Sequence, residues 1–197
     1  MAKDNIFYVW KVKDFRTLWT VGILTSSARW FEIIIFSVLT WQWFGDATYA
    51  GLLFALRMIA ISLTGIIFSL VSNHFSGQKI MFWAQATVAV SCLISSIFMN
   101  FEKEYAFYSL CALSLLSGAL WSVDFSYRRR MLADTLNVDQ VIFGISLDVI
   151  SSHATRFIGM LGGGVILTFF DNSTIFLILA ATYLIASAII IRVHDKA

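Results

Sequence analysis

Residues 18–43 read LWTVGILTSSARWFEIIIFSVLTWQW, an apolar run long enough to cross a lipid bilayer as a single helix. Trp19 and Trp41 stand near its ends, and at a rise of ~1.5 Å per residue they lie ~33 Å apart along the helix. This length matches the hydrocarbon core, and tryptophan is enriched at both membrane interfaces. The middle of the run holds Arg29 and Glu32, which are costly to expose to hydrocarbon. The stretch predicts a membrane-spanning helix that turns charged side chains toward protein or water.

The composition extends this prediction to the whole chain. Of 197 residues, 59% are hydrophobic and 13% are charged, and the mean hydropathy is +0.80. A soluble domain has roughly 45–50% apolar and about 25% charged residues. This chain therefore has too little charge to cover a water-facing surface. One spanning helix takes about 20 residues, which leaves room for six spans and not for twelve.

Polar clusters divide the chain into six apolar runs, each long enough to cross a bilayer. We therefore predict an all-α membrane protein with one six-span transmembrane domain over residues 1–197. The predicted spans are about residues 18–43, 48–72, 80–99, 105–125, 141–170 and 174–193.

The distribution of lysine and arginine predicts the orientation of these spans. Only Lys103 falls on one predicted side of the membrane, whereas ten of the fourteen basic residues fall on the other. These ten are Lys3, Lys11, Lys13, Arg16, Lys79, Arg128, Arg129, Arg130, Arg192 and Lys196. Cytoplasmic loops carry an excess of Lys and Arg, so we expect both termini in the cytoplasm and the chain in a bacterial inner membrane.

Ionisable side chains at membrane depth mark some spans and not others. They are Arg29, Glu32, Arg57, Asp148, His153 and Arg156, with Asp124 nearer the end of span four. Spans one, two, four and five carry them, and spans three and six carry none apart from Arg192 at the final exit. We therefore expect the first two helices of each triplet to face inward and the third to face lipid. This is the pattern of a 3+3 inverted repeat.

Two pairings are open to the charges of the first span. Arg29 and Glu32 are three residues apart and share a helix face, so they can pair, although Glu32 can instead reach Arg57 on span two. Asp148 lies about 12 Å along the axis from Arg156, too far for a simple pair. One interpretation of all these groups is structural, as interhelical ion pairs that hold the bundle in register.

The other interpretation is functional. Arginine outnumbers carboxylate near mid-membrane, and its guanidinium binds carboxylate and phosphate in bidentate fashion. This predicts a cationic cavity for a small organic anion, lined by Arg29, Glu32, Arg57 and Arg156. Burial and neighbouring charges can shift titration toward neutral pH, and the candidates for proton coupling are Glu32, Asp148 and His153.

Glycine marks expected close contacts between helices, because packing drives helix association in lipid. The predicted packing positions are Gly51, Gly159, Gly162 and Gly163. Motifs for enzymes are absent: the sequence has no HExxH, no P-loop, no GxSxG and no Cys–His metal spacing. We expect no catalytic residue, no metal and no cofactor. The net charge of +2 is also too small to indicate a nucleic-acid partner.

Five tracts together resemble the N-terminal half of a major facilitator superfamily transporter, in particular its drug- and siderophore-exporter branches. They are FRTLW at 15–19, GLLFALR at 51–57, SLVSNHFSGQK at 69–79, YRRRMLADTLNVDQV at 127–141, and Arg156 followed by GMLGGG at 159–164. They match the start of helix one, the start of helix two, the loop between helices two and three, the loop between helices four and five, and the antiporter motif of helix five. The resemblance implies a six-helix half of that fold.

The resemblance also implies a cytoplasmic gate built from the second loop and the end of span four. The residues at those places are Asn73, His74, Lys79, Asp124, Arg128 and Arg129. The family's Asp-Arg pair is Asn73-His74 here, and the proline of its antiporter motif is Met160. In the family the acidic residue helps to lock the gate, so its replacement puts that contact in doubt.

The family has about twelve spans, in two halves related by an axis along the membrane normal. Two six-span chains can meet around the same axis as a C2 dimer. We therefore predict a half-size transporter that works as a homodimer by alternating access and exports an organic anion. Two alternatives remain open. In the first, the chain is one half of a twelve-span transporter that is either split, with a second six-span chain as its partner, or truncated. In the second, the chain is a membrane scaffold or assembly protein that transports nothing.

Overall fold

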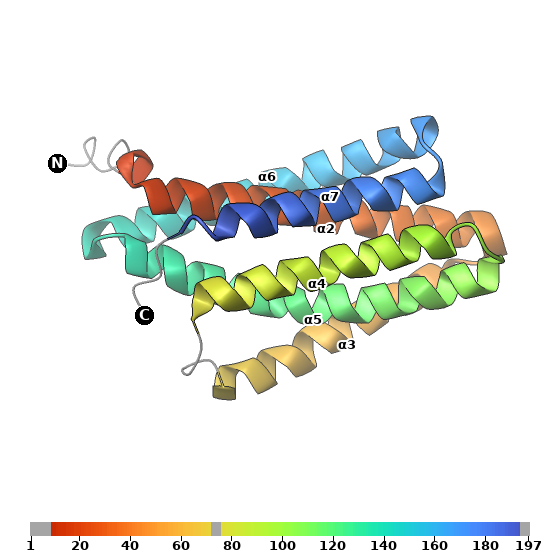
Figure 1. Ribbon diagram of the computed structural model, residues 1–197, viewed down its shortest axis with the longest axis horizontal. Helices are drawn as coiled ribbons and strands as arrows, with labels where there is room; N and C mark the ends of the chain where they lie inside the picture. Colours follow the sequence, from red (N-terminus) through yellow and green to blue (C-terminus); the bar gives the residue numbers. More distant parts are fainter. Residues whose placement is uncertain (1–8, 72–75, 194–197) are drawn as a thin grey trace.

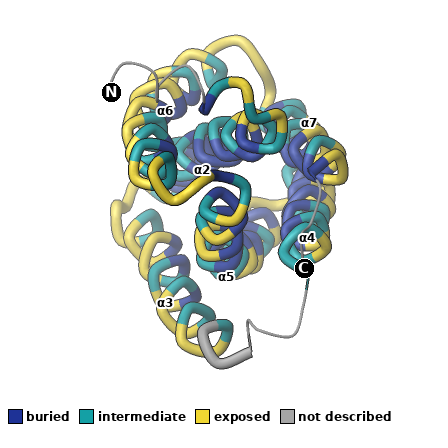
Figure 2. Tube along the Cα trace, turned by 90° about the vertical axis from the view of Figure 1, so that its left-hand side faces the viewer, coloured by how far each residue is buried: buried dark blue, intermediate teal, exposed yellow. Residues whose placement is uncertain are grey.

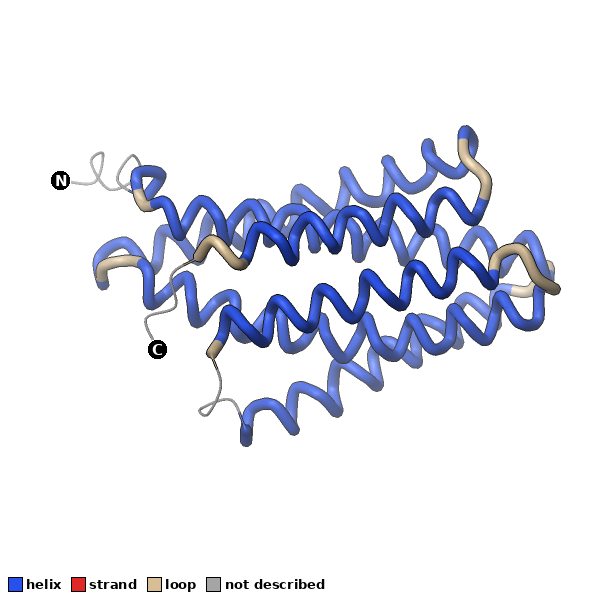
Figure 3. Tube along the Cα trace, in the orientation of Figure 1, coloured by secondary structure: helices blue, strands red, loops and turns tan. Residues whose placement is uncertain are grey.

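The computed structural model describes residues 9–71 and 76–193, and this part of the chain contains helices and no strands. Short loops join the helices (Figure 3). The six long helices, in chain order, are α2 (Lys13–Phe44), α3 (Ala47–Val71), α4 (Gly77–Phe98), α5 (Lys103–Thr135), α6 (Val138–Phe169) and α7 (Asn172–Ile190). All six are long and apolar enough to cross a membrane. The predicted all-α, six-helix fold class is confirmed.

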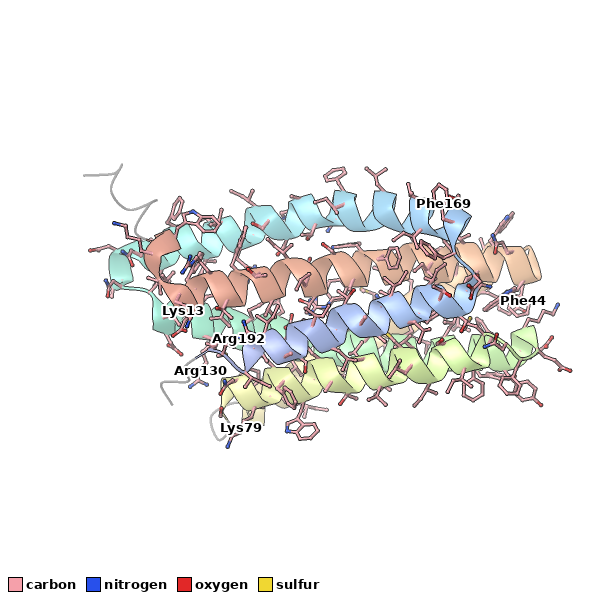
Figure 4. The ribbon with its side chains drawn as sticks, turned by 45° about the horizontal axis from the view of Figure 1, so that its top comes forward. Lys13, Phe44, Lys79, Arg130, Phe169 and Arg192 are labelled. Atoms are coloured by element: carbon pink, nitrogen blue, oxygen red, sulfur yellow. The ribbon has the colours of Figure 1, made fainter. Side chains whose placement is uncertain are left out.

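The helices run back and forth along the long axis of the bundle, so that α2 begins and α7 ends at the same end (Figure 1). Figure 4 places Lys13, Lys79, Arg130 and Arg192 near this end, far from Phe44 and Phe169. The structure thus gathers basic side chains from four separate segments at one end of the bundle.

The tract between spans four and five differs from the prediction. Residues 127–140 were expected to form a loop, whereas α5 continues to Thr135 and α6 begins at Val138. Arginine, methionine, leucine and alanine in this tract favour helix, and Arg128 and Leu132 are fully buried. Because α5 buries these side chains, it continues past residue 125, where the predicted fourth span ended.

The two triplets of helices pack on each other in matching ways. The second helix of each triplet lies against the first helix of the other, α3 on α5 and α6 on α2, while α4 packs on α7. Viewed along the bundle, α2 and α5 lie between α3 and α6 on one side and α4 and α7 on the other (Figure 2). This is the arrangement that a 3+3 inverted repeat produces.

The third helix of each triplet, expected to face lipid, exposes apolar side chains such as Trp83 of α4 and Leu184 of α7, while its other face is buried in the bundle. Buried side chains of α4, such as Cys92, and of α7, such as Leu179, belong to one core cluster. The Ser96 and Ser173 hydroxyls also bond to each other, 2.8 Å apart, where the two helices meet. The sequences of α4 and α7 carry no charge at membrane depth. A helix face of small and apolar side chains can nevertheless pack against neighbouring helices.

The most exposed helices are α3 and α6, which lie on the same side of the bundle (Figure 2). Their outer faces carry large apolar side chains, including Leu63, Ile66, Phe157 and Leu161. These faces are therefore available to lipid or to another protein.

The expected packing glycines fall into two groups. A Cβ built at Gly159 would lie 2.6 Å from the Ser27 carbonyl oxygen of α2, and one at Gly163 would lie 3.0 Å from the Phe31 ring. Cβ atoms built at Gly51 and Gly162 would meet nothing within 4 Å. Gly118 was not among the expected packing positions, yet a Cβ built there would lie 2.6 Å from the Arg57 carbonyl oxygen. Glycine thus permits the close approach of α6 to α2 and of α5 to α3.

Candidate functional site

The described residues form three buried ion-pair groups, and the first of them is centred on Glu32 of α2. Its carboxylate lies 2.7 Å from the Arg57 guanidinium of α3 and accepts a 2.8 Å hydrogen bond from the Tyr183 hydroxyl of α7. Glu32 is fully buried, and Arg57 is only 1% exposed. Of the two pairings open from the sequence, the structure forms the one between Glu32 and Arg57. The group joins three helices and satisfies its own charges.

The second group is centred on Asp124 of α5. Its carboxylate pairs with the Arg29 guanidinium of α2 and accepts a 3.3 Å hydrogen bond from the Gln85 amide of α4. The Arg128 Nε lies 3.8 Å from the same carboxylate. Asp124 therefore connects α2, α4 and α5 through one acceptor.

The third group joins α5 to α6. Arg128 donates to the Asp148 carboxylate, and the Nε of Arg129 lies 4.0 Å from the other oxygen of Asp148. Arg128 and Asp148 are both buried. This pair was not predicted from the sequence, because Arg128 was expected to lie in a loop. The signal that was present is the spacing of Asp124 and Arg128, which puts them on one face if the helix continues.

A pocket of about 220 Å³ opens between α2, α5 and α6. Its lining is Ser26, Arg29, Trp30, Trp121, Phe125, Arg128, Arg129, Val149, Ser152, His153 and Arg156. Aromatic rings support three of its guanidinium groups. The Arg156 Cζ lies 4.2 Å from the Trp30 ring centroid, and the Arg129 Cζ lies 3.8 Å from that of Phe125. The Arg29 Cζ lies 5.5 Å from the Trp121 ring, so the pocket combines cations with aromatic walls.

Positive charge exceeds negative charge at this pocket. Four arginines line it, and Asp124 and Asp148 are the carboxylates that pair with them. Among the residues that the structure describes, no carboxylate lies within 4.0 Å of the Arg156 guanidinium. An excess of arginine in a site of low dielectric attracts anions.

The structure separates the predicted cavity residues. Arg29 and Arg156 line the pocket, whereas Glu32 and Arg57 form a closed buried pair away from its lining. Of the proton-coupling candidates, Asp148 is buried beside Arg128, and His153 is exposed and lines the pocket.

The predicted gating residues are also separated. Asn73 and His74 lie outside the described residues. Lys79 is exposed in the first turn of α4, at the basic end of the bundle (Figure 4). The other three are helical residues at or beside the pocket, namely Asp124, Arg128 and Arg129. In residues 9–71 and 76–193, no three histidine, cysteine, aspartate or glutamate side chains are grouped as a metal site would require.

The end of the bundle opposite the basic cluster carries acidic side chains. Asp46 lies between α2 and α3, and the Thr48 backbone N–H, 2.8 Å from its carboxylate, lowers the pKa of Asp46. Asp171 caps α7, where the hydroxyl and the backbone N–H of Thr174 lower its pKa. Both carboxylates therefore stay ionised at neutral pH, and the charge of the two ends differs in sign.

The family model described as Major Facilitator Superfamily matches residues 18–196. The chain belongs to the major facilitator superfamily. No curated protein matches it. The match is to the superfamily as a whole, whose members are membrane transporters rather than enzymes, so this superfamily protein is an integral membrane protein of a transport family.

Proposed function

We propose that this superfamily member is a half-size transporter that works as a homodimer and moves a small organic anion by alternating access. The observation that carries the proposal is the pocket between α2, α5 and α6. It holds four arginines against two carboxylates, and its Arg156 pairs with no carboxylate in the described part of the chain. A solute anion supplies the missing negative charge.

Support for a second copy comes from the outer faces of α3 and α6. Both helices lie on one side of the bundle, and both expose large apolar side chains (Figure 2). Arg156 and His153 are exposed on α6, so a bundle that covers this side also covers the mouth of the pocket. Two related bundles around one axis form a cavity that can open to either side of the membrane in turn.

Support for transport over a scaffold role comes from the contrast between two parts of the interior. A scaffold needs only ion pairs that are closed and dry, such as Glu32 with Arg57. The pocket instead keeps an exposed Arg156 and an exposed His153 beside each other on α6. An unpaired charge at membrane depth is costly and typical of a solute pathway.

We further propose that the protein exports its solute and draws energy from a proton gradient. The resemblance to the exporter branches favours export, and the gathering of basic residues at one end favours a cytoplasmic position of both termini. His153 is the proton-coupling candidate that lines the pocket, whereas Glu32 is held by Arg57 and Tyr183. The ring nitrogens of an imidazole can accept and donate a proton, so a proton gradient is the proposed source of energy.

We expect Arg156→Gln to lower anion flux by about 10- to 100-fold, the effect of losing a hydrogen bond to a charged group. Fold stability should change little, because Arg156 is exposed and has no ion-pair partner in the described part of the chain. The measurement is flux of labelled dicarboxylates and aromatic carboxylates across proteoliposomes that contain the purified chain, with and without a pH gradient.

Arg192→Gln is the matched control, because it removes an exposed cation at the basic end and outside the pocket. Its flux should equal that of the unmodified chain. Flux that is unchanged by Arg156→Gln would reject this pocket as the anion site. A folded chain that moves none of the anions in either direction would favour the scaffold role.

A further inference from the structure

We infer that the pocket takes a dianion, and that Arg129 and Arg156 bind its two anionic groups. The inference rests on the proposed function and narrows it, since it names the charge of the solute and assigns Arg129 to solute binding. The resemblance had placed Arg129 in a cytoplasmic gate.

Arginines outnumber carboxylates at the pocket. Arg29 is bound to Asp124, and Arg128 is bound to Asp148, so each carboxylate is already neutralised by one guanidinium. Two arginines of the lining remain, Arg129 and Arg156. A ligand with two negative charges brings this pocket to neutrality, and a monoanion leaves one of the two guanidinium groups without a counter-charge.

Arg129 is held close to a carboxylate without bonding to it. Its Nε lies 4.0 Å from the Asp148 carboxylate, and both this Nε and the Asp148 Oδ2 are buried without a hydrogen-bond partner. Its guanidinium lies 3.8 Å from the centroid of the Phe125 ring, and 35% of the side chain is exposed. A stacked guanidinium keeps its donors in the plane of the group, where they can bind a carboxylate or phosphate.

Arg156 is presented in the same way from α6. Its guanidinium lies 4.2 Å from the centroid of the Trp30 ring, and in residues 9–71 and 76–193 it has no carboxylate within 4.0 Å. Trp30 in turn contacts Trp121 edge to face, with ring centroids 6.0 Å apart. The rings thus support two arginines that enter the pocket from different helices, α5 and α6.

A second copy of the chain does not supply the missing negative charge. The carboxylates at membrane depth are Glu32, Asp124 and Asp148, and each already pairs with an arginine of its own chain. A second copy therefore brings a second pocket with the same excess of two arginines, and each pocket needs its own dianion. The pocket of about 220 Å³ limits the solute to a small molecule, and small dicarboxylates and phosphate monoesters share the required chemistry.

The test compares acids of equal carbon number in proteoliposomes that contain the full chain. Labelled butyrate and succinate form one pair, and a phosphate monoester of similar size forms a second arm. We expect succinate flux to exceed butyrate flux by about 10-fold or more, since only succinate engages both arginines. Arg129→Gln should lower succinate flux by about 10-fold and change butyrate flux by less than about 3-fold.

Arg130→Gln is the matched control, because Arg130 is the next residue of α5 and lies outside the pocket lining. Its ratio of succinate to butyrate flux should equal that of the unmodified chain, and Arg129→Lys should recover part of the ratio by keeping the charge. Thermal unfolding of each variant checks that it is folded. Equal flux of butyrate and succinate through the unmodified chain would overturn the dianion inference and leave anion transport standing. An absence of flux for every acid would overturn the proposed function itself.

Discussion

Replacing Glu32 by glutamine should lower the free energy of unfolding by about 3–5 kcal/mol, the usual cost of removing one partner of a buried ion pair. Glu32 is fully buried and is the carboxylate that pairs with Arg57, whose own exposure is only 1%. The glutamine amide can still accept a hydrogen bond from Tyr183, but it leaves the Arg57 charge uncompensated between α2 and α3. The measurement is reversible unfolding of the purified chain in mixed detergent micelles.

Two further variants test whether the loss of stability comes from breaking the buried pair or from removing any carboxylate. Asp134→Asn removes the acid of an exposed pair with Arg130, whose side chains are 4.0 Å apart, and should cost no more than about 1 kcal/mol. The double variant Glu32→Gln/Arg57→Gln removes both buried charges and should be more stable than Glu32→Gln alone. If the double variant is no more stable than Glu32→Gln, the uncompensated charge of Arg57 is not the cause of the instability of Glu32→Gln.

Replacing Asp124 by asparagine should cost a similar amount, about 3–5 kcal/mol. Asp124 is buried and accepts hydrogen bonds from Arg29 and Gln85, and the Nε of Arg128 lies 3.8 Å away. The substitution removes the carboxylate that pairs with Arg29, and it weakens the contacts of α5 with both α2 and α4. The same unfolding measurement applies.

Asp148→Asn is the comparison for this second prediction. Arg128 loses its closest acceptor in that variant but keeps Asp124 nearby, so the cost should be smaller than that of Asp124→Asn. Equal or larger destabilisation by Asp148→Asn would contradict the view that Asp124 is the central acceptor of the network.

The helices of this fold could be predicted from the sequence because each apolar run is as long as a bilayer is thick. The run that contains Arg29 and Glu32 became α2, and the link at Gly45 and Asp46 was visible as a polar break. The end of α5 could not be predicted in this way. Its last turns contain three consecutive arginines, and hydropathy alone cannot tell a charged loop from a helix that buries Arg128 against Asp148.

The candidate site could be predicted only in part. Helical spacing favoured a pair of Arg29 with Glu32 and left Arg57 on the next span as the alternative partner of Glu32, and it excluded a simple pair between Asp148 and Arg156. Tyr183 and Gln85 were missed, because they lie on the two spans without charge at membrane depth. Tyr183 is 151 residues from Glu32 in the chain, and no local spacing in a single sequence specifies such a contact.

Transport in the proposed homodimer depends on a second six-span bundle that covers the exposed faces of α3 and α6. The mass of the purified chain in lipid nanodiscs, measured together with anion flux of the same preparation, tests this dependence most directly. We expect particles that contain two copies of the 22.2 kDa chain to carry the flux. Full flux from particles that contain one copy would contradict the homodimer and show that a single bundle provides the whole pathway.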